Sequence, residues 1–229
     1  MAESMRLLWG SGSPPCWRVM IALEEKNLQG YESKVLSFEE GGHKSPEVLE
    51  INPRAELPAF KHGDNIVNES AAACLYLESQ FKSQGNKLTP DSPAQQALMY
   101  QRLMEGILLT AKIGYVAFYD YYYPVGEQHD STMKRNKEKL TTEFKLWERY
   151  LQNTPCTVSS GSYLAGPFSL ADVVVFPDIA YAFRFGLSAE RYPNLAKYYN
   201  LLKERPSIKA TWQSEWMATA QGDDALKDI

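Results

Sequence analysis

The 229-residue chain is about one and a half times as long as a ~150-residue domain, so it fits one large domain or two small ones. Apolar residues make up 44% and charged residues 23%, which is enough to bury a hydrophobic core and excludes a disordered chain. The 24 basic and 28 acidic side chains give a net charge of −4. Without a run of basic residues, this balance argues against a nucleic-acid partner.

Membrane and secretion signals are also missing from the sequence. The longest uncharged stretch, residues 150–171, is broken by proline and glycine, so we expect no membrane-spanning helix. Residues 1–8 lack the basic segment and long apolar run of a secretory signal. The cysteines Cys16, Cys74 and Cys156 are widely spaced, which is typical of reduced thiols. We therefore expect a cytoplasmic protein without a membrane partner.

The first third of the chain alternates strand and helix patterns. Its predicted elements are a strand at Met5–Gly10, a helix from Pro14 or Pro15 to about Asn27, a strand at Tyr31–Phe38, a hairpin of residues 58–61 and 65–68, and a helix at Ser70–Phe81. This β-α-β-β-β-α order is typical of a thioredoxin-like domain, which we place at residues 1–82.

Beyond a polar linker at residues 83–90, strand patterns nearly vanish, and residues 91–229 are predicted to be all helical. The predicted helices are one from Ser92-Pro93 toward Tyr123, one over Ser131–Leu151, one over Leu170–Phe185 after a capping box at Ser169–Asp172, and two that begin at Pro193 and Pro206. Trp212 and Trp216 are expected one turn apart on the last helix.

Several kinds of site are excluded by the residues present. His43, His62 and His129 are not at metal-ligand spacing and no C-x-x-C pair occurs, so we expect no metal site. The glycine-rich loops of nucleotide-binding proteins and the G-x-S-x-G of hydrolases are also absent.

The segment Ser13-Pro14-Pro15-Cys16 remains, at the end of the first strand and the start of the first helix. In thioredoxin-like redox proteins this place holds C-x-x-C, whose first thiol is acidified by the helix N-terminus. Serine at position 13 excludes a two-cysteine redox cycle. Its hydroxyl could donate a hydrogen bond to another molecule's thiolate, or Ser13 could simply cap the helix.

Four motifs carry a family resemblance over essentially the whole chain: Ser13–Arg18, Asn52-Pro53 with Leu57-Pro58, Asn68-Glu69-Ser70, and Ser169–Asp172. Together they resemble the serine-using cytosolic glutathione transferases, most of all the rho class of fish, with the theta, zeta, delta and epsilon classes as relatives. The resemblance implies an α+β thioredoxin-like N-terminal domain followed by an all-α helical bundle.

The resemblance also implies roles for single residues. Ser13 is expected to be the catalytic hydroxyl that faces the glutathione sulfur, with Ser11 as the alternative. Pro58 is expected to be a cis-proline that exposes the backbone of Leu57 to the cysteinyl amide of glutathione. The full set of implied glutathione-binding residues is His43, Glu56, Leu57, Pro58, Glu69 and Ser70.

Charge complementarity supports the implied contacts at the two ends of glutathione. Glu69 is expected at the γ-glutamyl ammonium, Ser70 and its helix N-terminus at the neighbouring carboxylate, and His43 near the glycyl carboxylate. Three positions depart from related classes: Pro15 replaces a zeta cysteine, Glu56 a theta lysine and Ala71 a delta arginine. Zeta-type isomerase activity is therefore not expected.

An aromatic cluster between residues 115 and 123 is the candidate pocket for the second substrate. Its proposed members are Tyr115, Phe118, Tyr119 and Tyr122, joined by Trp216 near the C-terminus. The alternative is that these aromatics form core, because Tyr115, Phe118 and Tyr122 share helical spacing.

These observations predict an enzyme that adds the thiolate of reduced glutathione, its co-substrate, to hydrophobic electrophiles, as in the detoxification of foreign compounds. No permanently bound cofactor is expected, and the resemblance implies a homodimer. Two alternatives remain: a glutaredoxin-like thioltransferase that uses Cys16, and a non-catalytic ligand-binding or assembly module of the same fold.

Overall fold

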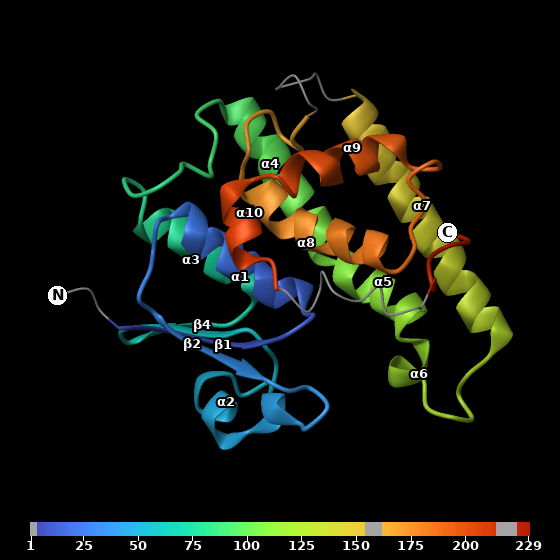
Figure 1. The fold of residues 1–229 in the computed structure, drawn as a ribbon, viewed down its shortest axis with the longest axis horizontal. Coiled ribbons are helices and arrows are strands. Elements are labelled where there is room, and N and C mark those ends of the chain that lie inside the picture. The colour runs from blue at the N-terminus through green and yellow to red at the C-terminus, as the bar shows by residue number, and fades with distance from the viewer. Residues whose placement is uncertain (1–3, 154–161, 214–223) are drawn as a thin grey trace. The chain divides into compact units, whose positions relative to one another are not determined.

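The structure is a computed structural model that describes residues 4–153, 162–213 and 224–229 (Figure 1). They form two compact units. One contains the chain up to Thr89 together with Pro206–Gln213, and the other contains Pro90–Arg205 together with the described C-terminal residues. Within the described residues, no helix is both long and apolar enough to span a bilayer.

The first unit is built on a four-stranded mixed sheet with the strand order β2-β1-β3-β4. Its strands are β1 (Met5–Gly10), β2 (Glu32–Leu36), β3 (Ala59–His62) and β4 (Asn65–Val67). β1 runs parallel to β2 and antiparallel to β3, and β3 and β4 form an antiparallel hairpin. β1 and β3 are the two central strands, and Leu7 and Leu8 of β1 are completely buried.

Helices α1 (Pro14–Glu25) and α3 (Ser70–Gln80) lie on one face of this sheet, and the short α2 (Pro46–Ile51) lies on the other (Figure 1). Ten of the twelve residues of α1 are buried, because α10 (Pro206–Thr211) packs on it as well. Trp17 Nε1 donates to Thr211 Oγ1 over 2.8 Å, and the Ser207 hydroxyl donates to the Glu25 carboxylate. α10 is therefore an integral part of the sheet unit.

A buried ion pair fastens residues 86–89 to the sheet unit. Lys26 is completely buried, and its Nζ lies 2.6 Å from a carboxylate oxygen of Glu78. The same Nζ donates to the backbone carbonyl of Asn86, and the other oxygen of Glu78 accepts from the backbone N–H groups of Leu88 and Thr89. Every strong polar group of the pair thus has a partner, as burial of two charges requires.

The second unit is helical. Its helices are α4 (Pro93–Ile107), α5 (Leu109–Ala117), α6 (Tyr119–Tyr122), α7 (Asp130–Asn153), α8 (Leu170–Arg184) and α9 (Pro193–Leu202). α8 is the central helix, with twelve of its fifteen residues buried and with α4, α5 and α9 packed against it. The backbones of α4 and α8 approach closely at Gly106, where a Cβ would lie 2.5 Å from Val175 Cγ2. As predicted from their spacing, Leu140, Phe144, Trp147 and Leu151 form the buried face of α7.

The predicted capping box at the start of α8 is confirmed. The Asp172 carboxylate accepts from the backbone N–H and the hydroxyl of Ser169, from the backbone N–H of Leu164 and from the Tyr198 hydroxyl. Burial dominates over these hydrogen bonds and raises the pKa of Asp172 to about 6.

The predicted single helix from residue 93 toward Tyr123 is wrong, because the chain breaks after α4 at Leu108 and again at Phe118. The second break follows from Gly114, where a Cβ would lie 2.9 Å from the Tyr122 ring. The missing side chain at position 114 leaves room for that ring, which the break at Phe118 brings close to Gly114.

Two further elements differ from the sequence predictions. α2 was not predicted, although Ser45 caps it by accepting from Val48 N and Pro46 follows the cap. α10 ends at Thr211, so Trp212 lies beyond its end rather than on the helix. Trp216, expected one turn further on, lies outside the described residues.

Candidate functional site

The predicted glutathione residues of the first unit come to one edge of its sheet. At this edge Gly10 pairs with Leu36, so the loops that carry Ser13 and His43 leave β1 and β2 together. Because β3 is antiparallel to β1, its first residue lies opposite Leu8 at the same end, directly after Pro58. β4 returns to that end before Ser70. Four segments distant in sequence therefore meet at the carboxyl end of β1.

Ser13 is the N-cap residue of α1. Its extended backbone, with φ −96° and ψ 110°, lets Oγ accept from the backbone N–H of Cys16 at 3.4 Å, and its carbonyl accepts from Trp17 N at 3.1 Å. A hydroxyl that accepts one hydrogen bond keeps its own proton for donation. Helix capping and donation to a bound thiolate are therefore compatible at Ser13, and the two interpretations of the sequence do not compete.

Cys16 lies one turn into α1 and is 1% exposed. Burial raises the pKa of its thiol to about 11, and this effect exceeds the opposing hydrogen bonds with Gly10 and Ser13 and the charge of Arg18. The backbone N–H of Gly10 points at its sulfur over 3.4 Å. A thiol with this pKa is protonated at neutral pH and does not act as a nucleophile.

The loop before β3 is held by the buried side chain of Asn52. Its Nδ2 donates to the Glu56 carbonyl over 2.9 Å, and its Oδ1 accepts from Arg54 N. The Leu57–Pro58 peptide bond is cis, as expected. The Glu56 side chain is exposed, whereas Leu57 is buried.

Glu69 and Ser70 open α3. Glu69 is exposed and has φ +73°, a left-handed conformation that is uncommon for a residue other than glycine. Ser70 is buried, and its hydroxyl accepts from Nη1 of Arg18, which is itself only 2% exposed. A buried guanidinium thus lies against the N-terminus of α3, where both the charge and the helix dipole favour an anion.

Two polar atoms at this edge are buried and have no hydrogen-bond partner within the described part of the chain. They are Nδ1 of His43, in the short 3-10 helix Gly42–Lys44, and Oδ1 of Asn68. Nδ2 of Asn68 donates to the carbonyl of Ile51 over 3.1 Å. Unpaired buried polar atoms are rare in proteins, and each of these two is available to bind a ligand group at this edge.

Sequence reasoning assigned no role to Arg18 or Asn52, although both lie in motifs that it used. A charged side chain among the apolar residues of the first helix was the available signal for Arg18. Asn52 carried no such signal, because its partners are backbone groups of the loop that it closes.

The predicted aromatic residues of the second unit contact one another and α8. The rings of Tyr115 and Tyr122 are 4.9 Å apart, and Phe118 packs against Tyr181 and Phe185. Tyr115, Phe118 and Tyr122 are 38%, 39% and 43% exposed, so they are not core residues.

Tyr119 differs from these three aromatics. Its hydroxyl donates to the carbonyl of His129 and accepts from the backbone N–H of the same residue, which closes the loop between α6 and α7. Tyr119 therefore has a structural role in this loop. The fifth predicted pocket residue, Trp216, lies outside the described residues.

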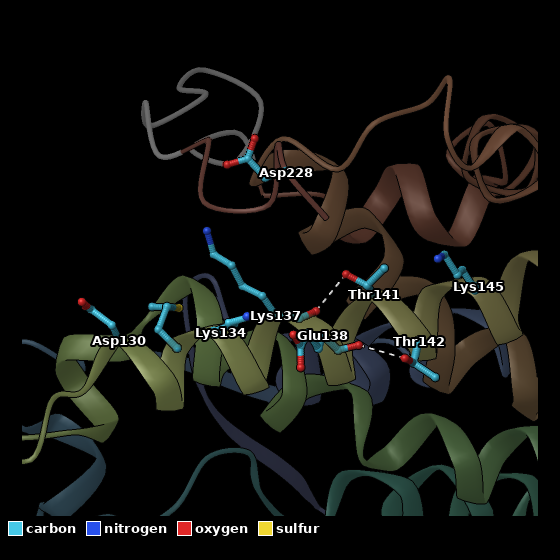
Figure 2. A pocket seen from close by; sticks show the side chains of 9 residues that line it. Asp130, Lys134, Lys137, Glu138, Thr141, Thr142, Lys145 and Asp228 are labelled. Atoms are coloured by element: carbon cyan, nitrogen blue, oxygen red, sulfur yellow. Dashed lines mark hydrogen bonds between the residues drawn. The ribbon is translucent and has the colours of Figure 1, made fainter.

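A hollow of about 610 Å³ on the surface of α7 contains none of the predicted site residues (Figure 2). Charges of both signs line it, and the hydroxyls of Thr141 and Thr142 donate to carbonyls of their own helix. Over residues 4–153, 162–213 and 224–229, no three His, Cys, Asp or Glu side chains gather in a metal-binding group.

The sheet unit has a serine as the N-cap of α1, a cis-proline before β3 and a Glu-Ser pair at the start of α3, as the resemblance to the glutathione transferases implies. Comparison with known proteins agrees. Residues 12–80 match the N-terminal domain of the glutathione S-transferases, and residues 115–215 match their C-terminal domain.

The chain is 65% identical over 230 residues to glutathione S-transferase A of Pleuronectes platessa, covering 100% of both chains. A crystal structure of a glutathione S-transferase from the Antarctic clam Laternula elliptica is 35% identical, with a TM-score of 0.83 and coverage of 99% of this chain and 100% of that one. A glutathione transferase of Phanerochaete chrysosporium, solved with oxidised glutathione, is 28% identical, with a TM-score of 0.77 and coverage of 94% and 97%.

The chain therefore belongs to the glutathione S-transferase family. It is a transferase that conjugates glutathione, and glutathione is its co-substrate.

Proposed function

We propose that this transferase is of the serine type and that the Ser13 hydroxyl donates a hydrogen bond to the thiolate of glutathione. The observation that carries the proposal is the geometry of Ser13: it caps α1 with one lone pair and retains a proton to donate, beside the N-terminus of a buried helix. Ser11 lies two residues before the cap, outside the helix. The helix N-terminus therefore favours Ser13 over Ser11.

The energies support this mechanism. A free thiol with a pKa of ~8.5 is only about 3% thiolate at pH 7. Lowering that pKa by about 2 units requires roughly 2.7 kcal/mol. One charge-assisted hydrogen bond contributes about 1.5–3 kcal/mol and a helix N-terminus up to ~2 kcal/mol, so the two suffice together. Ser13 then stabilises the nucleophile and takes no proton from it.

The rest of the tripeptide is assigned by charge. We propose that the γ-glutamyl carboxylate binds at the start of α3, where Ser70 is backed by the buried Arg18, and that Glu69 binds the ammonium. The Leu57 backbone is assigned to the cysteinyl amide. His43 is assigned to the glycyl carboxylate, with Glu56 at the margin of the site.

The half-exposed aromatics Tyr115, Phe118 and Tyr122 suit the apolar electrophile, because aromatic side chains commonly line such pockets. From its position in the sequence, Trp216 is also proposed to line the pocket for the electrophile. By resemblance we also propose a rho-class enzyme that acts as a cytoplasmic homodimer in detoxification, with residues 83–90 as the linker between domains.

The alternative thioltransferase would need Cys16 as its nucleophile. The buried, protonated thiol of Cys16 argues against it. A purely non-catalytic role is not favoured either, because the homology is to glutathione transferases.

The test is the conjugation of glutathione to a chlorodinitrobenzene-type electrophile by the native chain and by Ser13→Ala, Ser11→Ala and Cys16→Ala. We expect Ser13→Ala to lower turnover about 10–100-fold, the value of one charge-assisted hydrogen bond, while glutathione still binds. Ser11→Ala and Cys16→Ala should stay close to native. Loss of turnover in either of these two variants instead of Ser13→Ala would overturn the assignment.

A further inference from the structure

Phe38 is a half-exposed aromatic residue that has no role in the proposed conjugation mechanism. Its ring lies against the backbone of Gly10, the last residue of β1: a Cβ at position 10 would lie 2.1 Å from Phe38 Cε2. The Phe38 ring therefore packs in the space that a side chain at position 10 would fill. Gly10 lies directly before the loop that carries Ser13, at the end of β1 that pairs with Leu36.

The loop that follows β2 is a tight turn in which Phe38 is the first residue. Gly41 N donates to the Phe38 carbonyl and Gly42 N to the Ser37 carbonyl, over 3.1 and 2.8 Å. Gly41 has φ +72°, which glycine adopts without strain, and it leads into the 3-10 helix that carries His43. The backbone thus fixes the spacing between Phe38 and His43.

The imidazole of His43 packs against the Phe38 ring, and its Nδ1 makes no hydrogen bond to the described residues. The centroids of the Phe38 and His43 rings are 5.5 Å apart, with 42° between their planes. Among the residues that the structure describes, none pairs with the buried Nδ1 of His43. His62, by contrast, is oriented by a 2.9 Å hydrogen bond between its Nδ1 and the Tyr76 hydroxyl. Packing against Phe38 is therefore the contact from which we infer the orientation of the His43 imidazole.

We propose that Phe38 is a positioning residue for the glycyl end of glutathione. Seated on Gly10, its ring holds the His43 imidazole where it can donate to the glycyl carboxylate, and in this way it sets the preference for glutathione over the same peptide without glycine. The inference rests on the proposed assignment of His43, and it adds a specificity-determining residue that does not itself touch the co-substrate.

The test compares glutathione with γ-glutamylcysteine, which lacks the glycyl residue, as co-substrates for one electrophile. The variants are His43→Ala, Phe38→Ala, Phe38→Leu, Phe38→Tyr and the double variant with alanine at both positions. Ile66→Ala on β4 is the matched control, because Ile66 is a similarly exposed apolar side chain of the same sheet unit. Phe38→Leu retains apolar cover for Gly10 without a ring, so it separates loss of the ring from a folding defect.

The ratio of kcat/KM for glutathione to kcat/KM for γ-glutamylcysteine should fall about 10–100-fold in His43→Ala, Phe38→Ala and Phe38→Leu. This is the value of one charge-assisted hydrogen bond. The double variant should fall no further, because the two residues act through one contact. The loss should lie in KM for glutathione, with kcat unchanged at saturation. Phe38→Tyr and Ile66→Ala should keep the native ratio.

The possible outcomes test the role of Phe38 separately from the assignment of His43 to the glycyl carboxylate. A native ratio in both Phe38→Ala and Phe38→Leu, with a reduced ratio in His43→Ala, would overturn the role of Phe38 and leave the His43 assignment intact. A native ratio in His43→Ala would remove that assignment and the inference with it. Neither result bears on Ser13, which the alanine panel described above tests separately.

Discussion

The two units of the molecule present their candidate site residues in different ways. In the sheet unit, the candidates sit on backbone features: a helix cap at Ser13, a cis peptide bond at Pro58, a left-handed residue at Glu69 and a helix start at Ser70. In the helical unit, the candidates Tyr115, Phe118 and Tyr122 are half-exposed aromatic side chains that contact other aromatic rings.

This difference suits the two substrates. Glutathione has fixed charges and a peptide backbone, which we propose are bound by the charged and backbone groups at the end of the sheet. An apolar electrophile offers few directional groups, so a surface of aromatic rings can accept many shapes. We therefore expect changes to buried polar contacts to be costly in either unit and changes in the aromatic cluster to be mild. The predictions below test this contrast in order of decreasing effect.

The largest expected effect is on the buried ion pair of the sheet unit. Lys26→Met leaves the Glu78 carboxylate buried without its cation, and such a loss costs about 3–5 kcal/mol of unfolding free energy. The matched control is Lys34→Met, since Lys34 pairs with Glu47 at the same 2.6 Å but is half exposed. It should cost only about 0–1 kcal/mol. Urea unfolding of both variants measures the difference, and equal losses would contradict the account.

The second prediction concerns pH and Asp172 in the helical unit. Burial raises the pKa of Asp172 to about 6 in the folded chain, against ~3.9 in an unfolded one. Between these values the folded state binds more protons than the unfolded state, so stability falls as the pH rises from about 4 to 6. The drop should be about 3 kcal/mol, and the contribution is constant above that window.

Asp172→Asn removes the titrating group and serves as the comparison. It should be less stable than the native chain at neutral pH, because an amide cannot accept all the donors around the carboxylate. Its unfolding free energy should nevertheless change less between pH 4 and pH 6 than that of the native chain. A native-like slope in the variant would show that another group carries the pH dependence.

The third prediction concerns Glu69 and distinguishes the strain of its backbone from the binding of glutathione by its side chain. A non-glycine residue at φ +73° costs of the order of 1–3 kcal/mol, part of which Glu69→Gly recovers despite the flexibility of glycine in the unfolded chain. We expect unfolding free energy to rise by about 1 kcal/mol, while KM for glutathione rises about tenfold through loss of the carboxylate. Glu69→Gln should raise KM without the gain in stability. A variant Glu69→Gly that binds glutathione normally would refute the assigned contact.

The smallest effect is expected in the aromatic cluster. Tyr122→Leu removes the ring contact with Tyr115, and aromatic pairs of this kind contribute about 0.5–1.5 kcal/mol. We expect KM for the electrophile to change about 2–10-fold, in a direction that depends on the electrophile, with KM for glutathione unchanged. Steady-state kinetics with two electrophiles of different shape measure this, and a large rise in KM for glutathione would break the contrast between the units.

Much of the fold could be predicted from local patterns. The four strands, the capping box at Ser169 and the buried face of α7 follow from short-range signals in the sequence. The breaks at Leu108 and Phe118 could not, because they depend on contacts such as the Tyr122 ring over Gly114. The packing of α10 on α1 is likewise a long-range contact with no local signature.

Candidate site residues could be predicted only where they lie in a sequence motif of the family. Ser13, Pro58 and Ser70 were identified from such motifs, and the cis bond at Pro58 is present as expected. Arg18 contacts Ser70 and Phe38 packs on Gly10, and only the folded structure brings these pairs of distant residues together.

The central claim is that Ser13 stabilises the glutathione thiolate, and the pKa of enzyme-bound glutathione tests it most directly. The ultraviolet absorbance of the thiolate, followed over a pH series, gives this pKa for the native enzyme and for Ser13→Ala. The account predicts a native value about 2 units below the ~8.5 of a free thiol, and a value in Ser13→Ala at least about 1 unit above the native one. The same pKa in both proteins would contradict the account.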